Sequence, residues 1–307
     1  MNSSEQNKGV AASVAASCIF GAMYFYVTLL APLDGEDVFG WRMVFTVPFL
    51  ALFIRLAGYW ELVSALARRV RNNALLAPAL CLSSFLLGVQ LWLFLWAPLN
   101  GKALDVSLGY LLMPLVMVVC GRFVYRDRLE GYQKLAVACA ALGVANQVWQ
   151  VRALSIEMLV VAFGFPLYFV LRRALKTDHL GGLFFDMTLT LPAAIHILSR
   201  SPVGLEAFAE QTALLALVPL LGAISAFAIS LYVTAGRLLP LSLFGLLGYV
   251  EPVLLVLVSL LLGERMQPNE APTYLLVFCA VLLLAVGGLI RAKRAAIPRA
   301  LPKRGPS

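Results

Sequence analysis

The sequence predicts an all-α integral membrane protein with ten transmembrane helices arranged as two inverted five-helix repeats. Of its 307 residues, 61% are hydrophobic and only 13% are charged, whereas soluble domains have about 45–50% apolar and about 25% charged residues. Apolar runs near 20 residues recur along the chain, and each can cross the roughly 30 Å of bilayer hydrocarbon as a helix. Two distant segments, RMVFTVP at 42–48 and DMTLTLP at 186–192, repeat methionine, threonine and proline in register.

The apolar runs give ten expected spans. They are 9–30, 38–57, 75–97, 106–125, 133–150, 154–173, 181–199, 212–234, 241–262 and 273–291. The first run is a full span long after a nearly uncharged start, so we expect it to remain as the first helix. Runs such as VLLVLVSLLL are apolar on every side, which excludes the alternating strands of a membrane barrel.

The basic residues predict the orientation in the membrane. Most of the 24 Lys and Arg residues fall in alternate loops and in the tail RAKRAAIPRALPKRGPS. Because basic loops stay in the cytoplasm, both termini are expected there. The net charge of +8 is thus spread over cytoplasmic segments and needs no nucleic-acid partner. Between the second and third spans, GYWELVSALARRVRNN predicts an amphipathic helix at the inner surface.

The repeat divides the chain into halves at 9–150 and 154–291, followed by a basic cytoplasmic tail at 292–307. FGAMYFYV from Phe20 resembles FGFPLYFV from Phe163, and LGYLLMP from Leu108 resembles LGYVEP from Leu247. Five spans per half force the two copies to cross the membrane in opposite directions, as in many secondary transporters.

Arg42 and Asp186 occupy equivalent places in the two halves with opposite charge, and ionisable residues inside a membrane are costly and mostly functional. The inversion places them at depths that differ by about 15 Å, so we expect two gates rather than an ion pair. The alternatives are an Arg42 that snorkels to the outer surface and an Asp186 that pairs with a cytoplasmic arginine.

Glu251 is expected near the membrane midplane, directly before Pro252, where a proline frees a backbone carbonyl. A carboxylate at this depth is a candidate for binding the substrate or a proton, with a hydrogen bond between helices as the alternative. Pro114 and Pro252 recur between the halves and are the candidate hinges.

Further polar and aromatic residues at membrane depth are candidates for the wall of a substrate site. They are Gln90, Trp92, Tyr110 and Tyr249. Any one of them is more often packing than ligand contact, although both tyrosines belong to the repeated LGY.

The chain contains no motif for an enzyme or for a bound cofactor. The two histidines, His179 and His196, are far apart, and the five cysteines have no metal-ligand spacing. No GxxxxGK[ST] loop is present, so transport must use an ion gradient or the gradient of the substrate itself.

Three features of the chain point to a known family: SLGYLLMPL in the fourth span, EPVLL and LLLGER in the ninth, and an arginine early in the second. In these features the chain resembles the drug/metabolite transporter superfamily, in particular EamA members of the RarD type. Trp41 stands where RarD-like chains tend to have histidine. The resemblance implies a secondary transporter of the bacterial inner membrane that exports a small polar or zwitterionic metabolite, with a proton as the candidate coupling ion. The substrates it implies include amino acids or their derivatives and opine-type amino-carboxylate metallophores. A drug or toxic-compound efflux permease and a non-transporting receptor or scaffold remain the alternatives.

Overall fold

The computed structural model describes residues 3–151, 155–201, 206–254 and 271–296, and within these ranges the chain is helical without any strand. The elements are α1 (Ser3–Val27), η1 (Thr28–Leu30), α2 (Gly35–Leu56), α3 (Trp60–Asn72), α4 (Leu76–Leu99), α5 (Ala103–Val124), α6 (Gly131–Val151), α7 (Ile156–Leu175), α8 (Leu180–Leu198), α9 (Glu206–Glu210), α10 (Leu214–Leu238), α11 (Leu241–Leu247) and α13 (Ala271–Ala296). The prediction of an all-α protein is confirmed.

Eight of the described helices are long and apolar enough to cross a membrane. They are α1 with η1, α2, α4, α5, α7, α8, α10 and α13. The expected span 133–150 coincides with α6, which is not among the eight. The expected span 241–262 begins with a shorter apolar helical run, Leu241–Leu254, and its remainder lies outside the described residues. Helix α13 continues to Ala296, into the tail expected at 292–307.

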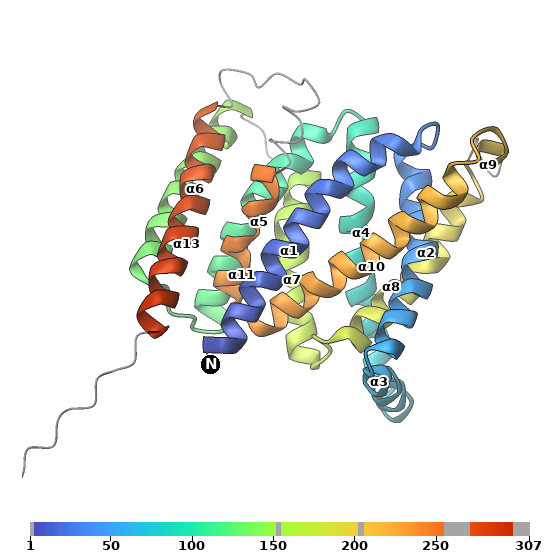
Figure 1. Ribbon diagram of the computed structural model, residues 1–307, viewed down its shortest axis with the longest axis horizontal. Helices are drawn as coiled ribbons and strands as arrows, with labels where there is room; N and C mark the ends of the chain where they lie inside the picture. The colour runs from blue at the N-terminus through green and yellow to red at the C-terminus, as the bar shows by residue number, and fades with distance from the viewer. Residues whose placement is uncertain (1–2, 152–154, 202–205, 255–270, 297–307) are drawn as a thin grey trace, which may run out of the picture.

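Amide side chains make α6 more polar than its neighbours, and α13 satisfies them. Asn146 donates to the hydroxyl of Thr273 at 3.0 Å, and that hydroxyl donates to Gln147 at 2.9 Å. Hydrogen bonds of this kind join helices in apolar surroundings. The two helices form a separate pair at one side of the molecule (Figure 1).

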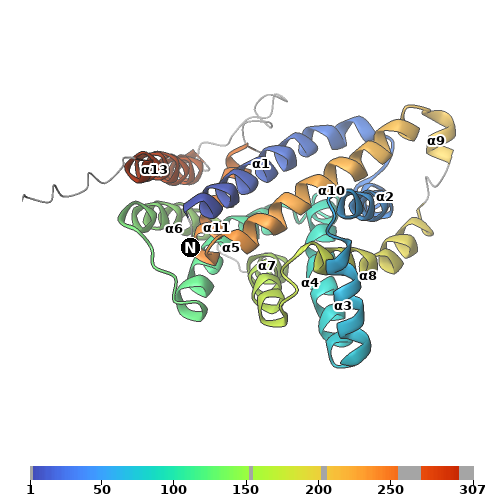
Figure 2. The same cartoon turned by 60° about the horizontal axis from the view of Figure 1, so that its bottom comes forward.

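Helices at equivalent places in the two expected halves, α1 and α7, α2 and α8, and α4 and α10, make equivalent contacts with the other half. Helix α1 packs on α10 while α7 packs on α4, and α2 packs on α10 while α8 packs on α4. Helices α2 and α8 also contact each other. Figure 2 shows α1 beside α10 along the upper face, with α4, α7 and α8 below them.

Close approach between helices depends on glycine at two of these crossings. A Cβ on Gly222 of α10 would lie 2.3 Å from the Cβ of Phe45 in α2, and a Cβ on Gly245 of α11 would lie 2.5 Å from that of Met117 in α5. Neither distance leaves room for a side chain. Small residues at helix crossings are typical of membrane bundles, where packing rather than the hydrophobic effect drives association.

Helix α3 confirms the predicted amphipathic segment. Val63 and Leu66 are buried, whereas its three arginines are exposed. Arg69 donates to the carbonyls of Leu175 and Lys176 at 2.9 and 3.2 Å, at the end of α7. A cation beside the last carbonyls of a helix is favourable, so α3 is fastened to the end of α7.

Candidate functional site

A cavity of about 360 Å³ lies among α1, α2, α4, α5, α7, α10 and the residues that follow α11. We call it the central cavity. Its polar lining comes from Arg42, Tyr110, Tyr232, Glu251 and Thr28, and the rest of the wall is apolar, with Phe20, Phe94 and Phe165 as its aromatic members. Three of the predicted site residues, from both halves of the chain, therefore meet at one place.

Arg42 reaches the central cavity from α2. Its side chain is buried, and Nε donates to Oγ of Ser225 on α10 at 2.7 Å. Among the described residues, Ser225 is its one hydrogen-bond partner, so the two terminal guanidinium nitrogens remain available to a ligand. The side chain points inward and does not snorkel to the surface.

Glu251 faces the same cavity from the other half of the chain. The helical run is interrupted just before it, because Gly248 and Tyr249 form a turn after α11 and helical residues resume at 250–254. In the part of the chain that the structure describes, no ion pair joins Glu251 to Arg42, and its carboxylate accepts no hydrogen bond. Two opposite charges thus line one cavity without contacting each other.

Tyr110 and Gln90 connect the cavity wall to its surroundings. The Tyr110 hydroxyl donates to the carbonyl of Gln90 at 3.3 Å, and Nε2 of Gln90 donates to the carbonyl of Val160 at 2.8 Å. Gln90 is buried and does not line the cavity. Its amide lies where a Cβ on Gly164 would be, so it ties α4 closely to α7.

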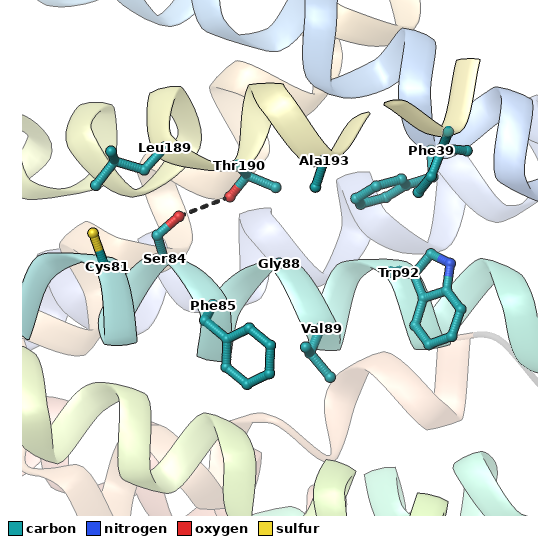
Figure 3. Close-up of a pocket in the computed structure, with 11 residues that line it drawn as sticks. Phe39, Cys81, Ser84, Phe85, Gly88, Val89, Trp92, Leu189, Thr190 and Ala193 are labelled. Carbon is teal, nitrogen blue, oxygen red and sulfur yellow. Dashed lines mark hydrogen bonds between the residues drawn. The ribbon is translucent and has the colours of Figure 1, made fainter. Parts of the chain in front are cut away.

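The other predicted residues lie away from the central cavity. Tyr249 is fully buried and donates to the carbonyl of Leu111 at 2.9 Å, which holds α5 against the turn before Glu251. Trp92 lines a separate apolar groove between α4 and α8 (Figure 3) and contacts Trp96 with ring centres 4.9 Å apart. Pro114 lies inside α5, and the hinge role of Pro114 and Pro252 stays a prediction.

Asp186 is not brought together with Arg42. It is 1% exposed and forms an ion pair with Arg172 of α7 at 3.3 Å. The Tyr168 hydroxyl donates to the same carboxylate oxygen at 3.0 Å and accepts from Arg172. We call Tyr168, Arg172 and Asp186 the buried triad. This geometry agrees with the second alternative given above for Asp186, in which its carboxylate pairs with an arginine.

Arg172 falls near the end of the expected span 154–173. It lies inside α7, 1% exposed, and donates to the carbonyls of Thr177 and His179 at 2.5 to 3.1 Å. These carbonyls belong to the connection between α7 and α8, so Arg172 fixes that turn. Burial, followed by the charge of Arg172, lowers the pKa of His179, whose neutral Nδ1 accepts from the backbone N–H of Gly182 at the start of α8.

Sequence reasoning missed Tyr168, Arg172 and Ser225. The i, i+4 spacing of Tyr168 and Arg172 places them on one face of a helix, which was a usable signal. Ser225 stands in an apolar run with no feature that marks it as the partner of an arginine more than 180 residues earlier.

The helices and the central cavity define a multi-pass membrane protein with a small, internally charged binding space, and the comparisons with known proteins agree with that class. A model of the EamA-like transporter family matches residues 7–146. An uncharacterized transporter of Pasteurella multocida is 40% identical over 287 residues, which cover 94% of this chain and 98% of that protein. The chloramphenicol-sensitive protein RarD of Pseudomonas aeruginosa is 43% identical over 277 residues, with 90% and 93% covered.

A solved crystal structure aligns with 91% of this chain and 97% of its own at a TM-score of 0.62, and at 19% identity it supports the fold alone. The two relatives carry the identification. The chain belongs to the EamA-like transporter family, as a RarD-like member of the drug/metabolite transporter superfamily, and it is a membrane transporter.

Proposed function

We propose that the chain is a secondary transporter of the bacterial inner membrane that exports a small zwitterionic metabolite by alternating access. Arg42 binds the carboxylate of the substrate, and Glu251 binds its amine or the coupling proton. The observation that carries this proposal is the central cavity, which both side chains line while neither pairs with the other. An arginine held by one neutral serine keeps its fork free for a carboxylate.

The size and lining of the central cavity limit the substrate. A volume of about 360 Å³ is at the lower end of the range for small-molecule sites, about 300–1,000 Å³. One guanidinium and one carboxylate match a ligand with one carboxylate and one amine, such as an amino acid or a derivative. A metallophore with several carboxylates would bring more negative charge than Arg42 alone can balance. The phenylalanine side chains of the wall favour a substrate with an apolar part.

Ten spans in two inverted halves remain part of the proposal. The equivalent contacts among α1, α2, α4, α7, α8 and α10 support it, since a two-fold axis in the membrane plane relates such contacts. Helices α2 and α8, which carry the repeated segment, start from opposite ends of the bundle, because a Cβ on Gly40 near the start of α2 would meet Leu198 at the end of α8. The end of the bundle that holds α3, the start of α1 and the end of α13 is rich in arginine, which supports a cytoplasmic placement of this end.

The first test identifies the substrate and the direction of transport. Metabolites released by cells that express the chain are compared by mass spectrometry with those released by cells that lack it. We expect a zwitterionic compound to be enriched in the medium. A correctly inserted protein without any released or accumulated compound would favour the receptor or scaffold instead.

The second test separates the two roles of Glu251 with inside-out vesicles and the identified compound. Glu251→Gln removes the charge and the proton site, and Glu210→Gln, at an exposed carboxylate of α9, is the matched control. If Glu251 carries the coupling proton, uptake driven by a proton gradient is lost while exchange of labelled for unlabelled substrate persists. If it binds the amine, both are lost. Unchanged uptake and exchange would remove Glu251 from the mechanism.

A drug or toxic-compound efflux permease is a second candidate, favoured by the mainly apolar wall of the central cavity. Growth of expressing cells over a panel of amphiphilic antibiotics tests it. Resistance that depends on the phenylalanines of the wall and not on Arg42 would favour this candidate over the metabolite exporter.

A further inference from the structure

Two further cavities lie on the other side of α2, away from the central cavity. The apolar groove between α4 and α8 has a volume of about 360 Å³ and is lined by Phe85, Val89, Trp92 and Leu189, among others (Figure 3). A polar pocket of about 320 Å³ lies at its end and is lined by Asp34, Glu36, Asp37, His196 and Arg200. Trp92 and Ile197 line both spaces, so the groove and the pocket adjoin each other.

The groove opens toward the lipid. Phe85 is 64% exposed and Leu189 is 42% exposed, and large apolar side chains that a membrane bundle leaves exposed face hydrocarbon. The two hydroxyls beside the groove have partners within the protein. Ser84 and Thr190 lie 3.0 Å apart, and the carbonyl of Asp186 accepts from whichever of them does not donate to the other, at 2.7 Å from Ser84 or 2.9 Å from Thr190. The groove therefore offers carbon surface to whatever occupies it.

The length of the groove matches one leaflet of a bilayer. Along α4 it extends from Cys81 to Trp92 (Figure 3), which at 1.5 Å per residue is about 16 Å, close to half of the roughly 30 Å hydrocarbon core. Trp92 stands where the apolar groove meets the polar pocket, and tryptophan favours that level of a membrane.

The polar pocket carries both signs of charge and an unsatisfied buried carboxylate. Asp37 is 2% exposed, and its Oδ2 has no hydrogen-bond partner in the described part of the chain. A buried carboxylate oxygen without a donor is costly, so a ligand that donates N–H groups there gains from pairing with it. Arg200 and His196, on the opposite wall, provide donors for a phosphate.

We propose that a phosphatidylethanolamine molecule of the bilayer binds along α4 and α8, with an acyl chain in the apolar groove, its phosphate at Arg200 and its ammonium at Asp37. The three carboxylates of the pocket disfavour an anionic headgroup such as phosphatidylglycerol. Phosphatidylcholine has the same charge but no N–H, so it cannot donate to Oδ2 of Asp37. The headgroup contacts therefore select phosphatidylethanolamine among these three lipids, and the apolar groove requires that the ligand carry an acyl chain.

The test uses the full chain, purified and delipidated in detergent, with dioleoyl lipids of the three headgroups added in turn. Binding is measured by native mass spectrometry, and stability by the melting temperature. We expect phosphatidylethanolamine to bind about tenfold more tightly than the other two, the ratio that one charge-assisted hydrogen bond provides. Equal binding of all three lipids would overturn the proposal.

Matched variants assign the selectivity to its residues. We expect Asp37→Asn to remove the preference for phosphatidylethanolamine over phosphatidylcholine. Arg200→Gln, at an exposed position, should weaken the binding of both lipids equally. Ala193→Phe fills the groove and abolishes retention of all three, while Ala216→Phe, at an exposed position of α10, and Glu210→Gln leave it unchanged. If Asp37→Asn fails to fold, the Arg200 and Ala193 variants decide the outcome.

A final arm separates a lipid from a soluble amine. sn-Glycero-3-phosphoethanolamine has the same zwitterionic phosphodiester headgroup without the acyl chains, and we expect it to leave the melting temperature unchanged. A full stabilising effect of this compound, or an Asp37→Asn variant that keeps the lipid preference, would show that the groove and pocket do not act together.

Discussion

Helices α2 and α8 carry the same segment in the same register, yet their leading charges have different environments. Arg42 has one neutral partner, Ser225, and faces the central cavity, whereas Asp186 is sealed in the buried triad with Tyr168 and Arg172. The difference originates in the neighbouring helix. In the repeat register, the counterparts of Tyr168 and Arg172 are Phe25 and Leu29 of α1 and η1, which are 46% and 45% exposed.

In this comparison, one position of the repeat faces a cavity in one half and belongs to a buried ion pair in the other. A charge that faces a cavity without an ionic partner can exchange its contacts with a ligand during transport. A charge in a buried ion pair is expensive to remove, because its partner then remains buried and uncompensated. Changes at Asp186 should therefore act on folding, and changes at Arg42 on transport.

The strongest test of the comparison is the charge-swapped double variant, Arg42→Asp with Asp186→Arg. We expect no folded protein, because the new arginine would lie beside Arg172 and the new aspartate beside Ser225, without any cation. Yield in the membrane fraction and elution from size exclusion in detergent measure this. Restored folding and transport would mean that Arg42 and Asp186 pair with each other in the functional protein.

The second largest effect is expected for Asp186→Asn, which leaves Arg172 without its counter-charge. Loss of one partner of a buried ion pair costs about 3–5 kcal/mol of the free energy of unfolding. The measurement is the melting temperature in detergent. Adding Arg172→Met, which removes the stranded charge, should recover part of the loss. A single variant as stable as the unchanged chain would show that the triad does not stabilise the fold.

How far the sequence predicts this molecule depends on whether the signal is local. Composition and apolar runs predicted the all-α membrane fold, and the spacing of Val63 and Leu66 against arginines predicted the amphipathic helix α3. Arg172 and Arg173 end an apolar run as a membrane stop signal does, and nothing in that pattern says which of them is buried. The structure buries Arg172 in the triad and places Arg173 over the ring of Tyr125, at 5.0 Å from its centre.

The candidate site was predictable in its residues and not in its assembly. Depth along a span identified Arg42 and Glu251 separately, as an outer gate and a midplane group. That they line one cavity depends on how α2, α10 and the turn at Gly248 and Tyr249 pack, which is a long-range property without any local pattern. Asp186 was identified as a charge within an apolar span, and the structure buries it in α8, but its partner could not be chosen from sequence distance.

The third prediction concerns Arg42→Gln, which should spare the fold and reduce transport. The variant keeps a donor near Ser225 and loses the charge that binds the carboxylate. Loss of a hydrogen bond to a charged group costs about 1.5–3 kcal/mol, or about 10–100-fold in apparent affinity for the exported compound. Uptake into inside-out vesicles measures it. Arg42→Lys separates charge from geometry, since lysine keeps the charge without the two-pronged fork. Wild-type affinity in the glutamine variant would exclude a role for Arg42 in binding.

The smallest effect is expected for Ser225→Ala, which removes the one hydrogen-bond partner of Arg42 among the described residues. The guanidinium keeps its charge and its access to the central cavity but loses the contact at Nε that orients it. We expect a loss of about 1 kcal/mol, or about fivefold in apparent affinity, with little change in melting temperature. Ser230→Ala is the matched control, because Ser230 is a buried serine of the same helix whose hydroxyl bonds the carbonyl of Ala226 at 2.6 Å. If both variants change the apparent affinity equally, the effect comes from the loss of any buried serine of α10, and the Ser225 contact does not position Arg42.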